Sequence, residues 1–224
     1  FICAYYSNFF IFIFMKIPFF SLKYNLPFLF FLLYLPFAQG QAKYLSDWPA
    51  NQIEIANTAA YESYLTIEEK RVFLYLNLAR INPKLFYQTI LKHYQMPEGF
   101  SDESLSNNKY IKSLSNTLKS MDPVGLVLPD KVLWMHAKCH AMESGQRGFV
   151  GHKRKKCEEP DFYSECCSYG FQHAIDIVIQ LLIDYQVVDL GHRKIMLNPK
   201  QTLLGVSIQP HKQYSYNAVM DFTY

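Results

Sequence analysis

The sequence predicts an α+β domain, with helices in the first part of the chain and strands at its end. A helix start is indicated at Thr66, because a hydroxyl side chain is followed three residues later by Glu69 in the pattern of a capping box. Apolar residues then recur at three- and four-residue steps, which is typical of a helix that packs one face against a core. Residues 205–209 and 214–222 instead alternate apolar and polar side chains, so they are predicted to form an antiparallel hairpin.

Local signals also place the other elements. The predicted helices span residues 66–80, 84–93, 110–119, 131–144 and 171–185. Asn82-Pro83 ends the first helix, and Asp130 caps the fourth after an extended piece over 124–128. Residues 95–108 lack periodicity and are rich in Ser, Asn and acidic residues, so they are predicted to be a surface loop.

The first 42 residues predict an export signal rather than part of the folded domain. They carry only Lys16 and Lys23 as charges and run through an apolar stretch to small and polar residues. Met15 is the expected start, and the mature chain is expected to begin near Lys43. An uncleaved membrane anchor is the alternative. After cleavage, the domain is expected to be secreted, periplasmic or extracellular, without a stable membrane span.

Composition limits the partners of the remaining chain. Without the leader, 20 basic and 19 acidic residues remain, which is a net charge of about +1. Nucleic acid is therefore excluded as the main partner, because it demands a broad basic surface. About 182 residues remain, enough for one domain with its own core, so residues 43–224 are predicted to form a single domain. A monomer is expected.

The predicted export also bears on the cysteines, because an oxidising compartment permits disulfides. After loss of the leader, four remain: Cys139, Cys157, Cys166 and Cys167. The adjacent Cys166 and Cys167 cannot easily join each other without strain, which leaves two of the three connectivities. The alternative is that some of the four are free buried thiols. The absence of a C-x-x-C pair argues against a zinc ribbon or a thioredoxin-type site.

Two polar stretches are interpreted as surface features and not as functional sites. His136 and His140 lie one helical turn apart, a spacing that can bind metal, but the acidic motif of a metalloprotease helix is missing. They are therefore interpreted as surface or boundary residues. The basic run at 153–156 is followed at once by acidic residues, so it is interpreted as a solvated loop rather than a docking patch.

His152 and His192 are the most informative candidates for a functional site. Each follows a glycine, and two acidic residues, Glu165 and Asp184, lie between them in the sequence. Two imidazoles and two carboxylates that converge can hold a divalent cation or transfer a proton. Asp184 falls in the last turn of a predicted helix, where the helix dipole disfavours a carboxylate. Such local exceptions are expected at functional sites.

Several short motifs lie along the chain in one order. They are Asn77-Leu78-Ala79-Arg80, the helix at 137–144, Gly151-His152, Ser164-Glu165, Leu181-Leu182-Ile183-Asp184, the stretch 191–199, Gly205-Val206-Ser207 and the stretch 219–222. Together they resemble the CAP superfamily, also called SCP or cysteine-rich secretory and allergen-5-like domains, in its bacterial exported form. The similarity covers nearly all of the mature domain, and Gly-His-Arg followed by an apolar triplet and Asn-Pro is its most specific piece.

The resemblance implies a three-layer α-β-α sandwich with a central antiparallel sheet. It also implies a cleft lined by the two histidines and two acidic residues named above. The chain departs from the family at Ser164-Glu165-Cys166, where Gly-Glu-Asn is usual, and at Leu181, where Trp is common. These departures bear on the geometry of the cleft.

The resemblance also implies a disulfide pairing. Exported bacterial relatives suggest a bridge between Cys157 and Cys167, on either side of Glu165. Cys166 is then expected to pair with Cys139 or to remain free. Such a bridge would close a short loop and hold the acidic residue in place.

Three functions of the site remain open. In the first, His152 and His192 ligate Zn²⁺ or a similar ion in a non-catalytic binding module, with Glu165 and Asp184 in support. The resemblance implies a lipid, a sterol or a protein as the ligand. The second is a metal-dependent peptidase or esterase with Glu165 as general base, although G-x-S-x-G and H-E-x-x-H motifs are missing. In the third, the four residues bond to one another and only hold the loops.

Overall fold

The computed structural model describes residues 44–97 and 108–224. The predicted leader with its start, and most of the predicted surface loop, lie outside the described residues. The described elements are α2 (Ala50–Ala56), α3 (Ile67–Ile81), α4 (Pro83–Thr89), the 3-10 helix η1 (Leu91–His93), α5 (Lys109–Ser120), β1 (Leu128–Pro129), α6 (Lys131–Arg147), β2 (Ser164–Tyr169), α7 (Ala174–Ile183), α8 (Gly191–Met196), β3 (Leu203–His211) and β4 (Ser215–Thr223). Among these residues, no helix has both the length and the apolar content needed to cross a bilayer.

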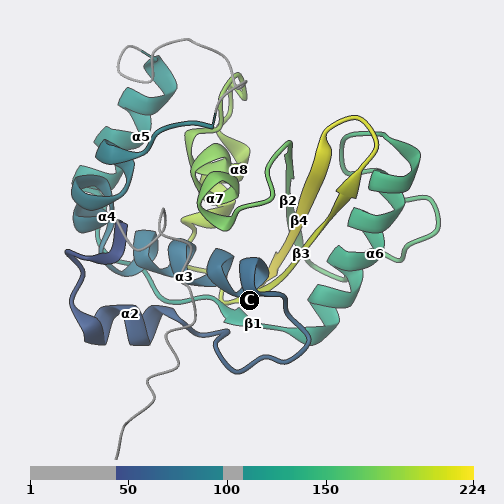
Figure 1. Ribbon diagram of the computed structural model, residues 1–224, viewed down its shortest axis with the longest axis horizontal. Coiled ribbons are helices and arrows are strands. Elements are labelled where there is room, and N and C mark those ends of the chain that lie inside the picture. Colours follow the sequence, from purple (N-terminus) through teal and green to yellow (C-terminus); the bar gives the residue numbers. More distant parts are fainter. Residues whose placement is uncertain (1–43, 98–107) are drawn as a thin grey trace, which may run out of the picture. The chain divides into compact units, whose positions relative to one another are not determined.

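The four described strands form one sheet in the order β1-β3-β4-β2 (Figure 1). β3 and β4 are the predicted antiparallel hairpin, which pairs Leu203 with Thr223 at one end and His211 with Ser215 at the other. β2 adds to the free side of β4, also antiparallel. β1 pairs with β3 in parallel, so the sheet is mixed and not wholly antiparallel as expected. A parallel pair is possible here because a long crossover that includes α6 connects the two strands.

The sheet lies between two layers of helices, which confirms the predicted α+β class (Figure 1). α6 covers one face, and α3 and α7 lie on the other. Gly205, Asp221 and Glu165 are paired across neighbouring strands and therefore share the α6 face. Cys166 and its partner Met220 point the other way, into the core shared with α3 and α7.

Helices α3 and α6 begin where local signals predicted, whereas α6 continues three residues past its expected end at Ser144 and α7 begins three residues after its expected start at Phe171. The Thr66 hydroxyl accepts a hydrogen bond from the backbone of Glu69, whose carboxylate accepts one from the backbone of Thr66, so the capping box is complete. Asp130 caps α6 through the backbone N–H of Leu133, and Gly148 ends that helix in the left-handed conformation. The predicted second helix is divided between α4 and η1.

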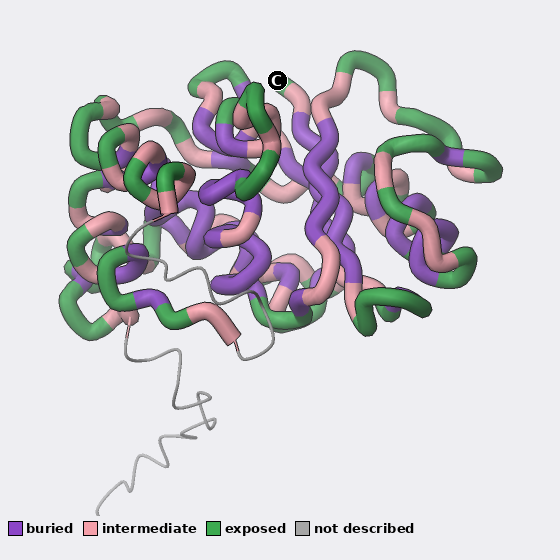
Figure 2. The backbone as a smooth tube through the Cα atoms, turned by 90° about the horizontal axis from the view of Figure 1, so that it is seen from above, coloured by how far each residue is buried: buried purple, intermediate pink, exposed green. Residues whose placement is uncertain are grey.

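The two faces of the sheet are packed differently. The main hydrophobic core lies on the α3 and α7 side and includes Phe73, Phe86, Ile177, Ile179 and Phe222. On the α6 side the apolar cluster is small and consists of Ala137, Ala141, Cys167 and Val219. Figure 2 shows that the central strands are nonetheless buried. Polar side chains fill much of this second interface, including the buried His140, Ser144, Glu165, Asn217 and Asp221. Such groups require hydrogen-bond partners when buried, so a cluster of them in this layer indicates a candidate functional site.

Arg80, from the first of the short motifs, has a structural role, because its side chain joins two segments of the chain through hydrogen bonds to their backbone. Its guanidinium is fully buried and donates to the carbonyl oxygens of Gly125, Met196, Asn198 and Gln201, at 2.6–3.1 Å. Burial lowers the pKa of Arg80 to about 10, so the side chain remains protonated at neutral pH. These bonds fix the segment that follows α8, the helix that carries His192.

Candidate functional site

His152 lies in the loop between α6 and β2, and Glu165 on β2 holds its ring. The distance from His152 Nδ1 to Glu165 Oε1 is 2.7 Å. The histidine side chain is 58% exposed, whereas the glutamate side chain is 4% exposed. The hydrogen bond that His152 donates to Glu165 raises the pKa of His152 above its ordinary value, against the effect of burial. Because Nδ1 is engaged, Nε2 is the ring nitrogen that remains for a ligand.

His192 at the start of α8 is held in the same way by Asp184, with 2.7 Å from Nδ1 to Oδ1. Asp184 is the C-cap of α7 with φ of 57°, so it lies just beyond the last turn in which it was predicted. The backbone N–H of Arg193 donates to its other oxygen at 3.2 Å. The Arg193 guanidinium donates to the carbonyls of Leu182 and Ile183, which are among those without helical partners at the end of a helix. These donors offset the unfavourable helix dipole.

The two histidines lie next to each other. Their ring centroids are 6.4 Å apart and their planes are inclined by 39°. Zn²⁺ binds imidazole nitrogens at about 2.0–2.1 Å, so a tetrahedral ion shared by two rings corresponds to centroids roughly 5 Å apart. The two rings would have to approach each other by about 1 Å to share an ion, and the exposed side chain of His152 has room to move. An imidazole that is hydrogen-bonded to a carboxylate through its other nitrogen is also the usual arrangement in metal sites. The structure thus brings all four predicted residues together as two carboxylate–imidazole pairs.

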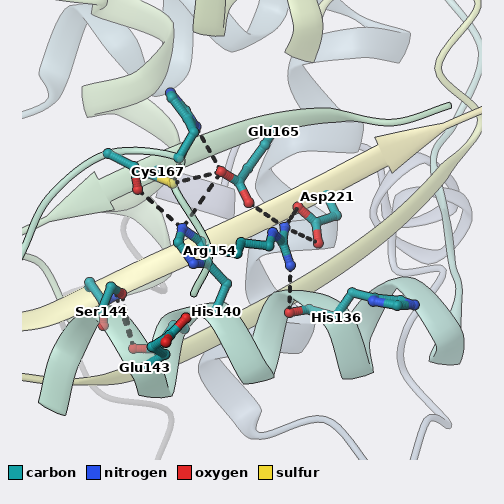
Figure 3. Close-up of polar contacts among 12 residues, drawn as sticks. His136, His140, Glu143, Ser144, Arg154, Glu165, Cys167 and Asp221 are labelled. Atoms are coloured by element: carbon teal, nitrogen blue, oxygen red, sulfur yellow. Dashed lines mark hydrogen bonds and ion pairs between the residues drawn. The ribbon is translucent and has the colours of Figure 1, made fainter. Parts of the chain in front are cut away.

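Arg154 is buried, so the interpretation of its basic run as a solvated loop is wrong at this position. Its Nη2 contacts Glu165 Oε2 and lies 2.9 Å from both carboxylate oxygens of Asp221 (Figure 3). Glu165 and Asp221 are direct neighbours on β2 and β4, and two buried carboxylates so close together require a cation. The other three residues of the run, all lysines, are exposed as expected.

The surroundings of Glu165 lower its pKa, whereas those of Asp221 raise its pKa. Burial alone would raise the pKa of Glu165, but the hydrogen bond from His152 and the charge of Arg154 outweigh it and hold that pKa below its ordinary value. Burial raises the pKa of Asp221 to about 8; Arg154 opposes this shift and the charge of Glu165 adds to it. Glu165 is therefore the carboxylate that stays ionised and orients the imidazole of His152.

One face of α6 anchors the loop that carries the first histidine. The Arg154 guanidinium donates to the backbone carbonyl of His136 at 2.9 Å, and His140 Nε2 donates to the carbonyl of Gly151 at 3.1 Å. The Glu143 carboxylate accepts hydrogen bonds from the backbone N–H groups of Lys155 and Lys156, at 2.9 and 3.1 Å. His136, His140 and Glu143 follow one another at steps of four and three, so they share a helix face. His140 is fully buried, and its interpretation as a surface or boundary residue is wrong. The helical spacing was the signal that could have identified all three.

The disulfide joins Cys139 to Cys157, which corrects the expected bridge between Cys157 and Cys167. The Cα atoms of the bridged pair are 5.7 Å apart and the residues are 18 apart in sequence. A closure of this length stabilises a fold by about 3 kcal/mol in the loop-entropy model, and here it ties the loop to α6. Cys166 and Cys167 are free and buried. They point to opposite faces of β2, Cys167 into the small cluster under α6 and Cys166 into the main core.

A second group of potential ligands lies beneath the first. The buried side chains of His140, Glu165 and Cys167 can hold a metal ion, because one donor atom from each lies within 4.8 Å of the others. Cys167 Sγ is 3.5 Å from Glu165 Oε1, and His140 Nε2 is 3.8 Å from the same oxygen. Cys167 was predicted only as a disulfide partner, and nothing in its local sequence indicated this position.

No known family model matches the chain, and no characterised protein is significantly similar to it. Similarity to CAP domains therefore rests on the short motifs alone. The site has to be interpreted from its own geometry and chemistry.

In metal-free protein, a change of His152 to asparagine is expected to lower the melting temperature more at about pH 6 than at about pH 9. Because the pKa of His152 is raised, its pairing with Glu165 contributes stability that is complete below the ordinary pKa of 6.5 and is lost as the pH rises through the folded-state value. The pKa of Glu165 is lowered in the folded protein, so the contribution of this ion pair is also lost as the pH falls through the folded-state pKa of Glu165. Calorimetry in the presence of a chelator measures the difference.

The control for this prediction is the same change in a Glu165→Gln background. Without the carboxylate, His152→Asn should alter the melting temperature equally at both pH values. A difference between wild type and His152→Asn that grows as the pH rises would contradict the ion pair.

Proposed function

We propose that this chain is an exported binding domain of the CAP type, in which His152 and His192 hold a divalent cation, with Zn²⁺ best suited to the donors. The observation that carries the proposal is the pairing of both Nδ1 atoms with buried carboxylates while the two rings lie 6.4 Å apart. Each pairing fixes a ring and leaves Nε2 as the ligand atom. Isolated surface histidines need no such support.

The environment of each carboxylate suits an orienting role. Glu165 is held by Arg154 and Asp184 by the backbone of Arg193, so neither depends on its histidine for a fixed position. Carboxylates of this kind raise the basicity of the imidazole and increase metal affinity. When bound, the ion supplies an electrophilic centre for an oxygen donor of a ligand. Two nitrogen ligands leave coordination positions open, so the affinity for the ion is expected to be modest.

The same contacts favour binding over hydrolysis. A general base needs an oxygen that is available to take a proton, and a pKa near the working pH. Glu165 has one oxygen bonded to His152 and the other to Arg154, and its pKa is lowered. Following the resemblance, we therefore propose a lipid, a sterol or a protein as the ligand, recognised outside the cytoplasm.

Equilibrium binding of Zn²⁺ to the metal-free protein tests the histidine pair. Asp184→Asn keeps both imidazoles but removes the charge that orients His192, so it is expected to weaken binding about 10–100-fold. His192→Ala removes a ligand and is expected to weaken binding at least as much. His93→Ala, an exposed histidine on η1, is the matched control and should bind as wild type does. Unchanged affinity in both Asp184→Asn and His192→Ala would refute the proposed metal site.

A further inference from the structure

We propose a second cation site, distinct from the histidine pair, in which buried His140, Glu165 and Cys167 bind one thiophilic divalent ion such as Zn²⁺. The three donors come from two layers of the fold, His140 from α6 and the other two from β2. Figure 3 shows Glu165 and Cys167 on the strand, on the side that faces the helix of His140. Imidazole, carboxylate and thiolate together suit Zn²⁺ or Co²⁺ better than Mg²⁺ or Ca²⁺.

Two of the three distances between donors already match those around a small ion, and the third is within 4.8 Å. Four ligands placed 2.0–2.3 Å from Zn²⁺ lie roughly 3.3–3.8 Å from one another in a tetrahedral site. Glu165 Oε1 lies 3.5 Å from Cys167 Sγ and 3.8 Å from His140 Nε2. Glu165 Oε1 has two lone pairs, so it can accept the hydrogen bond from His152 and still bind an ion. The fourth position is left to water.

The surroundings of Cys167 keep its sulfur away from bulk solvent. Its side chain is buried, and Ala137 and Val219 are its apolar neighbours under α6.

Ion binding requires two proton changes. The thiol of Cys167 releases its proton to solvent as the sulfur–metal bond forms, so one proton is released for each ion bound. His140 Nε2 now donates to the carbonyl of Gly151, and its Nδ1 has no hydrogen-bond partner among the described residues. A ring that ligates through Nε2 carries its proton on Nδ1 instead. The hydrogen bond between His140 and the Gly151 carbonyl is then given up.

Cobalt spectroscopy tests the second site, because sulfur bound to Co²⁺ gives a strong near-ultraviolet charge-transfer band that histidine and carboxylate ligands do not give. Metal-free protein with its disulfide intact is titrated with Co²⁺ without oxygen. We expect the band to grow to one equivalent in wild type and to be absent in Cys167→Ala. Cys166→Ala, the adjacent buried thiol on the opposite face, is the matched control and should keep the band.

X-ray absorption of the zinc-loaded wild type gives a second measurement that needs no variant, with one sulfur expected at about 2.3 Å from the ion. His192→Ala should keep the cobalt band while it weakens binding at the histidine pair. The experiment can therefore refute one proposed site without refuting the other. A wild type without the band overturns the inference. So does a band that survives in Cys167→Ala, or one that is lost in Cys166→Ala.

Discussion

Replacement of Arg154 with methionine is expected to lower the free energy of unfolding by about 3–5 kcal/mol. The guanidinium is the shared partner of Glu165 and Asp221, and all three side chains are almost completely buried. Methionine keeps much of the apolar volume of the arginine, but it leaves Asp221 without a cation and Glu165 with His152 alone. One of them must then take up a proton or the layer must open. Urea unfolding followed by circular dichroism measures the loss.

Lys153→Met is the control, because the neighbouring lysine is exposed and its replacement should change stability by no more than about 0.5 kcal/mol. Addition of Asp221→Asn to Arg154→Met should recover part of the loss, since it removes the carboxyl group that has lost its cationic partner. Loss of the cation raises the folded-state pKa values of both carboxylates. The stability of Arg154→Met should therefore improve as the pH falls, and equal stability of Arg154→Met and Lys153→Met would contradict the buried triad.

The elements that could be predicted from the sequence are those with local signals. α3 and α6 begin at capping side chains, Thr66 and Asp130, and the final hairpin alternates between its two faces. β2 could not be predicted, because Ser-Glu-Cys-Cys-Ser-Tyr has no apolar alternation and both of its faces are buried. Its conformation depends on pairing with β4, which lies far later in the chain. α2 and α8 are too short to show a periodic pattern.

Residues of the candidate site could likewise be predicted only where they carry a local signal in the sequence. The two histidines were identified because each follows a glycine, and their carboxylates because they stand in short motifs between the two histidines. Arg154 and Cys167 were missed because their roles depend on what other elements place around them, whereas the helical spacing of His140 was seen but interpreted as that of a surface or boundary residue. Asp221 did carry a signal, since it shares the inner face of the predicted strand with Val219. A carboxylate on the buried face of a strand indicates a cationic partner elsewhere in the chain.

Replacement of Gly205 with alanine is expected to destabilise the domain by about 3 kcal/mol. Gly205 lies on β3 where α6 crosses the sheet, and a Cβ there would stand 2.1 Å from the carbonyl carbon of Leu133 and from the backbone nitrogen of Trp134. Both contacts are with helix backbone, so no side-chain rotation can relieve them. Gly205 is not in the left-handed region, so close packing and not backbone freedom requires glycine here. Thermal and urea unfolding measure the loss.

Gly125→Ala is the matched control, because a Cβ at that exposed position meets nothing within 4 Å. A methyl group at position 205 must move α6 away from the sheet, and α6 carries His140 and the carboxylate of Glu143 that anchor the loop of His152. Gly205→Ala that remains folded should therefore also bind Zn²⁺ more weakly than Gly125→Ala. If the two variants unfold alike and bind alike, the spacing between α6 and the sheet does not control the site.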